Sequence, residues 1–287
     1  MKVTKIRPYG FCKGVIDAIK IAKETKLQNP NTPITILGML VHNNDVILDL
    51  ENLGIKTIHD DTKSLSELLK EIKEGIVIFT AHGHDKFLEK QANEQGLTFI
   101  DATCKFVTFN NNNIIESIKN GYEVIYIGKL GHLETNATLS IDDNICLYDV
   151  KKGLIKKPKT DKIIVYNQTT LSLLDLKEIH QELKEKYNNL IIGDEICGAT
   201  RKRQEQLLNC EEDYDLIIIV GDSKSNNTLS LYNIAKSKFV KSTIYRVRNL
   251  NELLQYDLKN ATSALILTGT STPSEFADEI ENYLIKK

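Results

Sequence analysis

The chain has 287 residues, of which 41% are hydrophobic and 26% are charged, and its formal net charge is −2. This length predicts about two domains of ordinary size and is enough for a large core without disulfides. The near-neutral balance gives no electrostatic signature for binding nucleic acid or an anionic membrane surface. The longest strongly apolar runs, such as residues 216–220, are far shorter than the ~20 residues of a membrane span. The N-terminus shows neither a secretory signal nor a transit-peptide pattern, so we expect a cytosolic protein.

Five cysteines occur in the chain, at positions 12, 104, 146, 197 and 210. An odd number in a chain without an export signal argues against a disulfide framework. Three of them are evenly spaced, because Cys104 follows Cys12 by 92 residues and Cys197 follows Cys104 by 93. Even spacing over this distance indicates an internal repeat.

Each third of the chain predicts the same elements in the same order. A strand ends at the cysteine and is followed by a helix, a second strand that ends at a glycine, a third strand, and another helix. In the first third these are residues 2–12, 14–26, 32–38, 75–84 and 86–95. In the second they are 97–104, a helix through 114–121, 122–128, 162–172 and 173–187. In the last they are 189–197, 199–210, 214–221, 263–273 and 274–287.

Strands that alternate with helices predict an α/β fold with parallel sheets covered on both faces. Such sheets bind ligands beyond the carboxyl ends of their strands, where the cysteines and the polar residues of this chain lie. We therefore expect three similar small α/β lobes, residues 1–103, 104–196 and 197–287, arranged with pseudo-threefold symmetry around a shared centre. The alternative is one or two ordinary doubly wound domains in which the cysteine spacing is accidental.

The three repeated cysteines are candidate metal ligands, because a thiol at a helix N-terminus has a lowered pKa and metals bind the thiolate. Their spacing fits no local zinc knuckle, which needs close pairs such as C-x2-C. An iron–sulfur cluster is the better candidate, and three ligands would leave one iron open to act as a Lewis acid. Buried thiols without a metal remain the alternative. Cys146, in a predicted strand, and Cys210, at the end of a predicted helix, are interpreted as structural.

Uncharged and titratable donors recur in the loops after the predicted strands. They are His42, His82, His132, Glu134, Gln168, Thr169, Thr170, Ser225, Asn226, Asn227 and Ser271. Histidines, hydroxyls, amides and helix N-termini can all donate hydrogen bonds to phosphate oxygens, so the set predicts an anion pocket. Each member has a structural alternative: Ser225 and Asn227 could simply cap a helix, for example. No Walker-type loop or G-x-G-x-x-G is present, and a nucleotide site has no support.

Nine short motifs, taken together, resemble one family. They are GFCKGV at 10–15, VHN at 41–43, AHG at 81–83, DATC at 101–104, GH-x-E at 131–134, QTTLS at 168–172, C-x-AT-x-x-RQ at 197–204, S-x-N at 225–227 and S-x-P at 271–273. In these residues and in their order the chain is similar to the 4-hydroxy-3-methylbut-2-enyl diphosphate reductases, LytB-type enzymes that catalyse the last step of the non-mevalonate (MEP) isoprenoid pathway. The motifs run from residue 10 to residue 273, nearly the whole chain.

The resemblance implies a cofactor, a substrate and two products. Cys12, Cys104 and Cys197 would hold one [4Fe–4S] cluster per chain, with an open apical iron at the centre of the three lobes. The substrate would be an allylic alcohol that carries a diphosphate. Its hydroxyl would leave as water with two electrons and two protons, and the products would be isopentenyl and dimethylallyl diphosphate. Ferredoxin or flavodoxin would supply the electrons, and no nucleic-acid or membrane partner is implied.

The resemblance also implies roles for the loop residues. Glu134 would donate protons towards the hydroxyl, with Thr169 and His132 in the same network. The diphosphate would lie among donors from all three lobes, namely His42, His82, His132, Thr169, Ser225, Asn226, Asn227 and Ser271. We expect the pKa of the Glu134 carboxyl to be raised beside a diphosphate and a desolvated cluster, which would keep its proton available near neutral pH.

Three residues depart from the family pattern. Leu133 and Lys105 stand where proline is common, and Asn226 stands where a second serine is common. None of them is an implied cluster ligand or acid. Two other functions remain as alternatives: a non-redox iron–sulfur hydro-lyase, for which a basic carboxylate-binding set is missing, and an iron or redox sensor, which would leave the pocket donors unexplained.

Overall fold

The computed structural model describes residues 1–193, 196–258 and 260–287. Its helices are α1 (Lys13–Gln28), α2 (Asn44–Asn52), α3 (Leu65–Glu71), α4 (Lys86–Glu94), α5 (Lys105–Lys119), α6 (Leu133–Leu139), α7 (Leu173–Lys186), α8 (Gly198–Leu208), α9 (Asn226–Lys238), α10 (Leu250–Leu253) and α11 (Ser274–Lys286). Among the described residues, no helix has both the length and the apolar character needed to cross a membrane.

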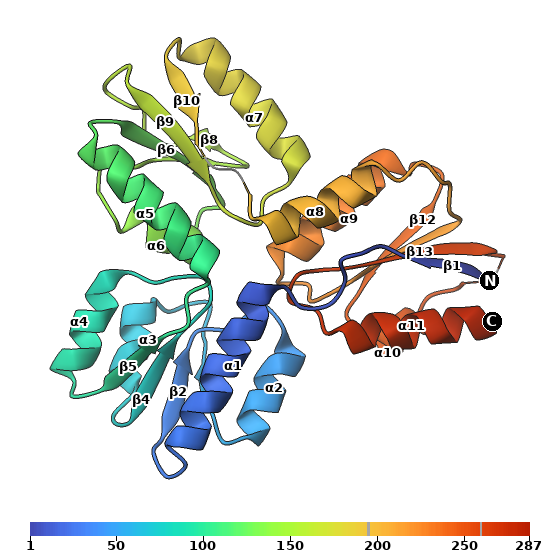
Figure 1. Cartoon of the computed structure of the whole chain (residues 1–287), viewed down its shortest axis with the longest axis horizontal. Helices are drawn as coiled ribbons and strands as arrows, with labels where there is room; N and C mark the ends of the chain where they lie inside the picture. Colours follow the sequence, from blue (N-terminus) through green and yellow to red (C-terminus); the bar gives the residue numbers. More distant parts are fainter. Residues whose placement is uncertain (194–195, 259) are drawn as a thin grey trace. The chain divides into compact units, whose positions relative to one another are not determined.

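The strands form three separate sheets (Figure 1). The repeated strands have the same order in all three. In each sheet the strand that precedes a cysteine lies at one edge. It pairs with the third strand of a repeat, the third strand pairs with the second, and the second pairs with a fourth strand. The first sheet is β5 (Thr98–Asp101), β4 (Ile76–Phe79), β2 (Ile34–Leu37) and β3 (Lys56–Ile58). The second is β10 (Leu190–Ile192), β9 (Ile163–Asn167), β6 (Glu123–Gly128) and β7 (Cys146–Asp149), with β8 (Gly153–Leu154) added. The third is β1 (Lys2–Lys5), β13 (Ser263–Thr268), β11 (Leu216–Val220) and β12 (Thr243–Val247).

Apart from β8, which pairs antiparallel with β7, the strand pairs are parallel. The predicted α/β class with several parallel sheets is therefore confirmed. The predicted strand before Cys197 includes Asp194 and Glu195, which lie outside the described residues. The arrangement of the lobes around one centre stays a prediction.

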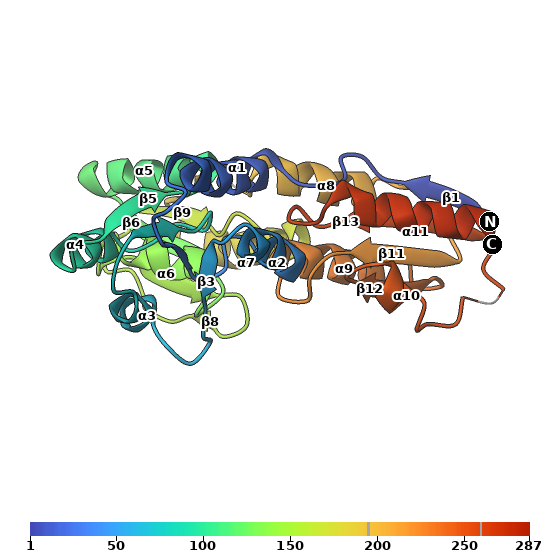
Figure 2. The same ribbon diagram turned by 90° about the horizontal axis from the view of Figure 1, so that it is seen from below.

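The first strand differs from the expected division of the chain. A lobe of residues 1–103 was expected to contain it, but β1 pairs with β13, with Lys2 opposite Ser263 and Lys5 opposite Ile266. The physical reason lies in the repeat itself, because each cysteine strand joins the sheet of the repeat before it. The strand before Cys12 has no preceding repeat, and it occupies the same edge position in the last sheet. The two termini accordingly lie side by side (Figure 1 and Figure 2).

By packing, the chain divides into two compact units. The first consists of Met1–Cys12, Thr169–Glu178 and Ile196–Lys287, and the second of Lys13–Gln168 and Ile179–Glu195. The third sheet thus belongs to the first unit, and the other two sheets belong to the second. The expected lobe boundaries after residues 103 and 196 stay a prediction.

The apolar run Leu216–Val220 shows why these strands are hydrophobic at every position. Leu216, Ile218 and Val220 pack on one face of the third sheet with residues of α10 and α11. Ile217 and Ile219 pack on the other face with residues of α8 and α9. Successive side chains of a strand point to opposite faces, so a sheet covered by helices on both sides needs an unbroken apolar strand.

Glycines at the ends of second strands allow the following helix to pack closely. A Cβ atom at Gly128 would lie 2.5 Å from the Oγ1 atom of Thr135, and one at Gly221 would lie 2.4 Å from that of Thr228. Both threonines are fully buried in the first turns of α6 and α9. Because these two glycines have no side chain, the polar N-termini of α6 and α9 can pack directly against the strand ends.

The core of the third sheet predicts a large effect of truncation at Ile218, which is fully buried. We expect Ile218→Ala to lower the free energy of unfolding by about 2–5 kcal/mol, because it leaves a cavity between β11 and its helices. Ile285→Ala is the control, since that side chain is 56% exposed, and its effect should stay within about 0.5 kcal/mol. Equal thermal midpoints for the two variants would contradict this account of the core.

Candidate functional site

Each repeated cysteine is anchored to the end of a neighbouring strand by its own backbone. The amide N–H of Cys12 donates to the carbonyl of Thr270 at 2.9 Å, that of Cys104 to Ala81 at 3.0 Å, and that of Cys197 to Thr169 at 3.3 Å. The three accepting residues follow β13, β4 and β9. The next residues are Ser271, His82 and Thr170, so these candidate residues occupy equivalent positions in the three repeats.

Each cysteine also lies at the start of a helix. Cys12 directly precedes α1, while Cys104 and Cys197 are the N-cap residues of α5 and α8 and make no side-chain cap hydrogen bond. No disulfide joins any of the five cysteines, all of which lie in the described part of the chain. Because the unpaired amides and dipole of a helix N-terminus favour a thiolate, the local geometry suits metal ligation at all three positions.

The first compact unit links two of these cysteines through a buried polar network. The sulfur of Cys197 lies 3.2 Å from the hydroxyl of Thr200, which accepts a hydrogen bond from the Asn227 side chain at 3.3 Å. The amide oxygen of Asn227 accepts from the backbone of Thr270 at 2.9 Å, and the carbonyl of Thr270 accepts from Cys12. Both ends of the Asn227 amide are thus used inside this unit, and its expected diphosphate contact stays a prediction.

The N-terminus of α9 carries two more of the candidate donors. Ser225 caps the helix, since its hydroxyl accepts from the N–H of Thr228 at 3.3 Å. A hydroxyl that accepts one bond can still donate its hydrogen to an anion. The Nδ2 atom of Asn226 is buried and has no partner among the described residues, so it is also an available donor. Ser271 is buried in the same unit.

The backbone carbonyls of Thr169 and Thr170 accept hydrogen bonds within this unit. The Thr170 carbonyl accepts from the hydroxyl of Ser230 at 3.2 Å, as the Thr169 carbonyl does from Cys197. The Thr169 side chain is buried, and its expected place in a proton network stays a prediction.

The second compact unit brings three histidines together. The ring centres of His42 and His82 are 4.3 Å apart, those of His42 and His132 are 5.6 Å apart, and those of His82 and His132 are 5.7 Å apart. They come from the loops after β2, β4 and β6, the strand ends at which the sequence predicted an anion pocket. The Nε2 atom of His82 is buried without a partner among the described residues. It is therefore placed to bond a ligand.

Burial keeps two of these imidazoles neutral. Desolvation, followed by the nearby His42 and His132, lowers the pKa of His82 well below its usual value of 6.5. Desolvation, followed by the charges of His42 and Lys129, lowers the pKa of His132 to about 3. The Nδ1 atom of His132 accepts from the amide of Glu134 at 3.2 Å, so the ring hydrogen is on Nε2. Neutral imidazoles of this kind offer N–H donors to an anion without adding positive charge.

Glu134 is a buried acid of this unit, with 2% of its surface exposed. Its Oε1 atom lies 3.4 Å from the hydroxyl of Tyr126, a residue that is fully buried beneath it. Burial, followed by the charge of Glu134, raises the pKa of Tyr126 well above 10, so the phenol keeps its proton. The same hydroxyl bonds the side chain of Thr138, which in turn donates to Asn111 at 3.1 Å. The sequence interpretation missed Tyr126, because its place in an apolar strand is typical of a core residue.

Gln168 has a structural role in the second unit. It is fully buried, and its side-chain oxygen accepts from Thr135 at 3.2 Å and from the backbone of Lys129 at 3.1 Å. These bonds connect the end of β9 to the loop and helix that carry His132 and Glu134. Gln168 therefore supports those side chains through the backbone.

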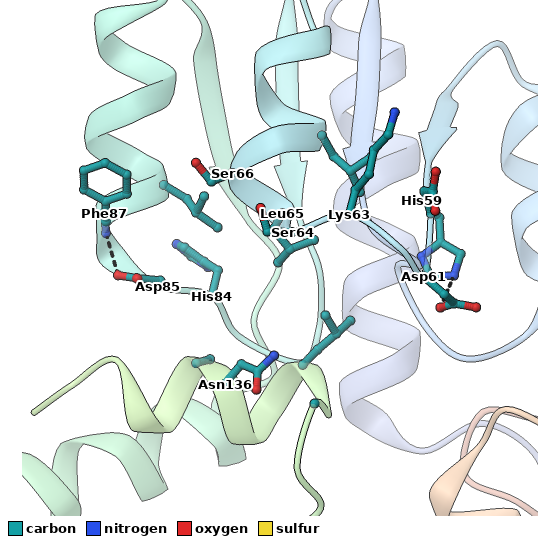
Figure 3. Close-up of a pocket in the computed structure, with 16 residues that line it drawn as sticks. His59, Asp61, Lys63, Ser64, Leu65, Ser66, His84, Asp85, Phe87 and Asn136 are labelled. Carbon is teal, nitrogen blue, oxygen red and sulfur yellow. Dashed lines mark hydrogen bonds and ion pairs between the residues drawn. The ribbon is translucent and has the colours of Figure 1, made fainter. Parts of the chain in front are cut away.

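A cavity of about 420 Å³ lies beside α6 in the same unit (Figure 3). It is lined by part of the 59–68 segment, by Leu133 and Asn136 of α6, and by His84, Asp85, Phe87 and Leu88. The ring of His84 stacks on Phe79, with ring centres 3.9 Å apart, and bonds Glu89 at 2.9 Å. None of the three clustered histidines lines this cavity, so it is distinct from the predicted anion pocket.

The comparisons with known proteins give one consistent result. The family model described as LytB protein matches residues 3–285. The chain belongs to the LytB family. It is 39% identical to the 4-hydroxy-3-methylbut-2-enyl diphosphate reductase of Malacoplasma penetrans, over 100% of this chain and 98% of that protein. It is 40% identical to the Bacillus subtilis protein of the same name, over 99% of this chain and 90% of that protein.

Solved structures of LytB reductases have the same fold. The E-1-hydroxy-2-methyl-but-2-enyl-4-diphosphate reductase from Plasmodium falciparum superposes with a TM-score of 0.86 at 30% identity, over 99% of this chain and 87% of that one. A second structure is described as (E)-4-hydroxy-3-methyl-but-2-enyl diphosphate reductase, the terminal enzyme of the non-mevalonate pathway. It gives a TM-score of 0.66 at 26% identity, over the full length of both chains.

A buried arginine tests whether this LytB chain suits an anionic iron–sulfur cluster. Arg203 is 2% exposed, and its charge interacts with Cys12 and Cys197. Its Nε atom is buried and has no partner among the described residues. A cluster held by thiolates is an anion that would compensate this buried cation, so the residues fit the group. The sequence interpretation missed Arg203, although the C-x-AT-x-x-RQ motif contained it.

Two departures from the LytB pattern fall at equivalent places in helices. Lys105 and Leu133 are the first residues of α5 and α6, a position for which proline is well suited because it needs no N–H there. Both helices begin at these residues without it. The other two cysteines lie where they were expected or close to it: Cys146 is buried in β7, and Cys210 lies just after α8 ends at Leu208.

The histidine cluster predicts a loss of stability in acid. The pKa of His132 is lower in the folded chain than its value of about 6.5 in the unfolded chain, so only the unfolded chain binds this proton as the pH falls below about 6.5. Stability is therefore lost as the pH falls from about 6.5 towards 3, by about 1.4 kcal/mol per pH unit for each such group.

The variant His132→Asn should make this dependence shallower by about one proton, because an asparagine oxygen can still cap α6. Urea unfolding midpoints between pH 7 and pH 5 measure the effect. Parallel curves for the wild type and the variant would show that His132 does not contribute to the acid sensitivity.

Proposed function

We propose that this chain is an iron–sulfur reductase that removes the allylic hydroxyl of 4-hydroxy-3-methylbut-2-enyl diphosphate. The substrate takes up two electrons and two protons, releases water, and becomes isopentenyl or dimethylallyl diphosphate. The observation that carries this proposal is full-length membership of the LytB family, supported by the three strand-end cysteines and the buried Glu134. A cytoplasmic location and ferredoxin or flavodoxin as electron donor belong to the same proposal.

The cysteines at positions 12, 104 and 197 would hold one [4Fe–4S] cluster per chain, which supplies electrons and a Lewis-acidic iron at the reacting end of the substrate. Their backbone bonds to the strand ends support this assignment, since these bonds restrict the position of each thiol. The charge of Arg203 acts on two of the thiols and would offset part of the negative charge of a cluster they hold.

The diphosphate would be bound by neutral donors at the strand ends. His42, His82 and His132 would offer imidazole N–H groups, and the hydrogen on Nε2 of His132 is fixed by the bond at Nδ1. Ser225, Asn226, Asn227, Ser271 and Thr169 complete the proposed set, of which Asn226 has an available amide donor.

Glu134 would deliver the proton to the departing hydroxyl, because hydroxide itself is a poor leaving group. Its carboxyl lies at the N-terminus of α6, two residues after His132, and is almost completely buried. The Tyr126 hydroxyl donates to the carboxylate, and this bond restricts the orientation of the carboxylate after the proton has left. Thr169 and His132 would take part in the same network.

Anaerobic purification and a turnover assay test the proposal. We expect a brown protein that contains iron and consumes a reduced dye only when the hydroxylated diphosphate is added. A colourless, iron-free protein after anaerobic reconstitution would exclude the cluster. A brown protein that does not consume the dye with this substrate would instead favour a hydro-lyase or a sensor.

Replacement of the acid tests its role. Glu134→Gln keeps the shape of the side chain but cannot release a proton, so kcat should fall at least about 100-fold with the iron content unchanged. Glu94→Gln is the control, because that carboxylate is exposed on α4. Normal turnover by the Glu134 variant would show that another group donates the proton.

Removal of the Tyr126 hydroxyl tests the support of this acid. Tyr126→Phe should lower kcat roughly tenfold, leave KM unchanged, and shift the acid limb of the pH–rate profile, because Glu134 loses its buried donor. Tyr148→Phe is a matched control, since Tyr148 lies on the neighbouring strand and its hydroxyl also bonds a carboxylate, Glu182, at 2.5 Å. Equal pH profiles for the two variants would exclude the positioning role of Tyr126.

A further inference from the structure

Arg203 connects the backbones around two of the repeated cysteines. It lies on α8, and its Nη2 atom donates to the carbonyl of Gly10 at 2.5 Å, across 193 positions of the sequence. Its Nη1 atom donates to the carbonyl of Ala199 at 3.1 Å. Gly10 precedes Cys12 by two residues, and Ala199 follows Cys197 by two residues. The guanidinium therefore bridges both segments inside the first compact unit.

The charge of Arg203 has no carboxylate partner. Within residues 1–193, 196–258 and 260–287, no Asp or Glu forms an ion pair with it, although 98% of its surface is buried. The charged groups that act on it are the thiols of Cys12 and Cys197. Moving a cation out of water is strongly unfavourable unless an anion or a set of acceptors compensates it.

One N–H donor of the guanidinium has no acceptor among the described residues. The Nε atom is buried without a partner, whereas both terminal nitrogens bond carbonyl oxygens. Hydrogen bonds to cluster sulfurs and the net charge near a cluster are two of the factors that set its reduction potential. An extra positive charge favours the reduced state, because that state carries one more negative charge.

We propose that Arg203 is a positioning residue that clamps the Cys12 and Cys197 segments together and raises the reduction potential of the cluster they hold. The clamp comes from the two carbonyl bonds, and the shift in potential comes from the buried charge. This inference rests on the proposed iron–sulfur function. The Arg203 side chain would thus help to retain the cluster in the protein and would also make its reduction more favourable.

Reduction potentials of the reconstituted holoenzyme test the charge. Arg203→Met removes the charge and keeps an unbranched side chain, whereas Arg203→Lys keeps the charge and loses the forked geometry. We expect Arg203→Met to shift the one-electron reduction equilibrium at least tenfold towards the oxidised state, a change of 59 mV. Arg203→Lys should stay within threefold of the wild type. An equal shift in both variants, or none in the methionine variant, would overturn the proposed electrostatic role.

The control for this titration is Arg201→Met. Arg201 lies on the same helix, is more exposed, and pairs with Glu205 at 3.7 Å. Its replacement should leave the potential as in the wild type. A shift as large as that of Arg203→Met would mean that any charge on α8 has the same effect, and the specific role of Arg203 would be wrong.

Thermal stability with and without the cluster tests the clamp. The difference between the midpoints of holoprotein and apoprotein should be smaller in both Arg203 variants, and iron should be lost to a chelator at least threefold faster. A purely structural role would lower both midpoints equally and leave that difference unchanged. If Arg203→Met does not fold, the lysine variant still decides, because it should lose iron faster while keeping its potential.

Measurements on the wild-type protein distinguish a failure of the proposed function from a failure of the proposed role of Arg203. If wild-type protein binds no cluster after anaerobic reconstitution, the proposed function fails and the role of Arg203 fails with it. If the wild type binds the cluster and reduces the substrate but Arg203→Met keeps the wild-type potential and iron retention, only the inference about Arg203 is wrong.

Discussion

The three candidate cluster ligands are positioned by one backbone interaction that occurs three times. In each repeat the amide of a cysteine donates to the carbonyl at the end of the adjacent strand. This bond aligns the end of one strand with the start of the helix that follows the cysteine. Because parallel strands present their carboxyl ends at one edge, the bond brings each cysteine close in the fold to a loop residue that is a candidate for ligand binding.

The same constraint explains where the sequence was informative. Even cysteine spacing, glycines at strand ends and unbroken apolar strands all follow from a repeated strand–helix unit, and each can be read without coordinates. The clustering of His42, His82 and His132 followed from placing all three at strand ends. The pairing of β1 with β13 could not be read in this way, since a four-residue strand carries no mark of which sheet it joins.

Buried polar residues were the hardest to predict. Tyr126 lies in an apolar strand, and Arg203 lies on a helix rich in charged residues, so neither pattern separates a site residue from an ordinary one. Their roles come from what packs against them: the Glu134 carboxyl in one case and two cysteine segments in the other. Asn227 shows the converse, because a residue expected to face the ligand has both ends of its amide bound within the protein.

The arrangement of charge also explains how a chain of net charge −2 can bind a diphosphate. In the proposed site, neutral imidazoles, amides and hydroxyls would provide directional hydrogen-bond donors for the diphosphate without adding positive charge. The one fully buried cation, among the described arginines and lysines, is Arg203 at 2% exposure. Its charge acts on the thiols of Cys12 and Cys197, which lie in the same compact unit. In the proposed function, this buried positive charge would compensate the group that gains electrons, while uncharged donors would hold the anion that is later released as product.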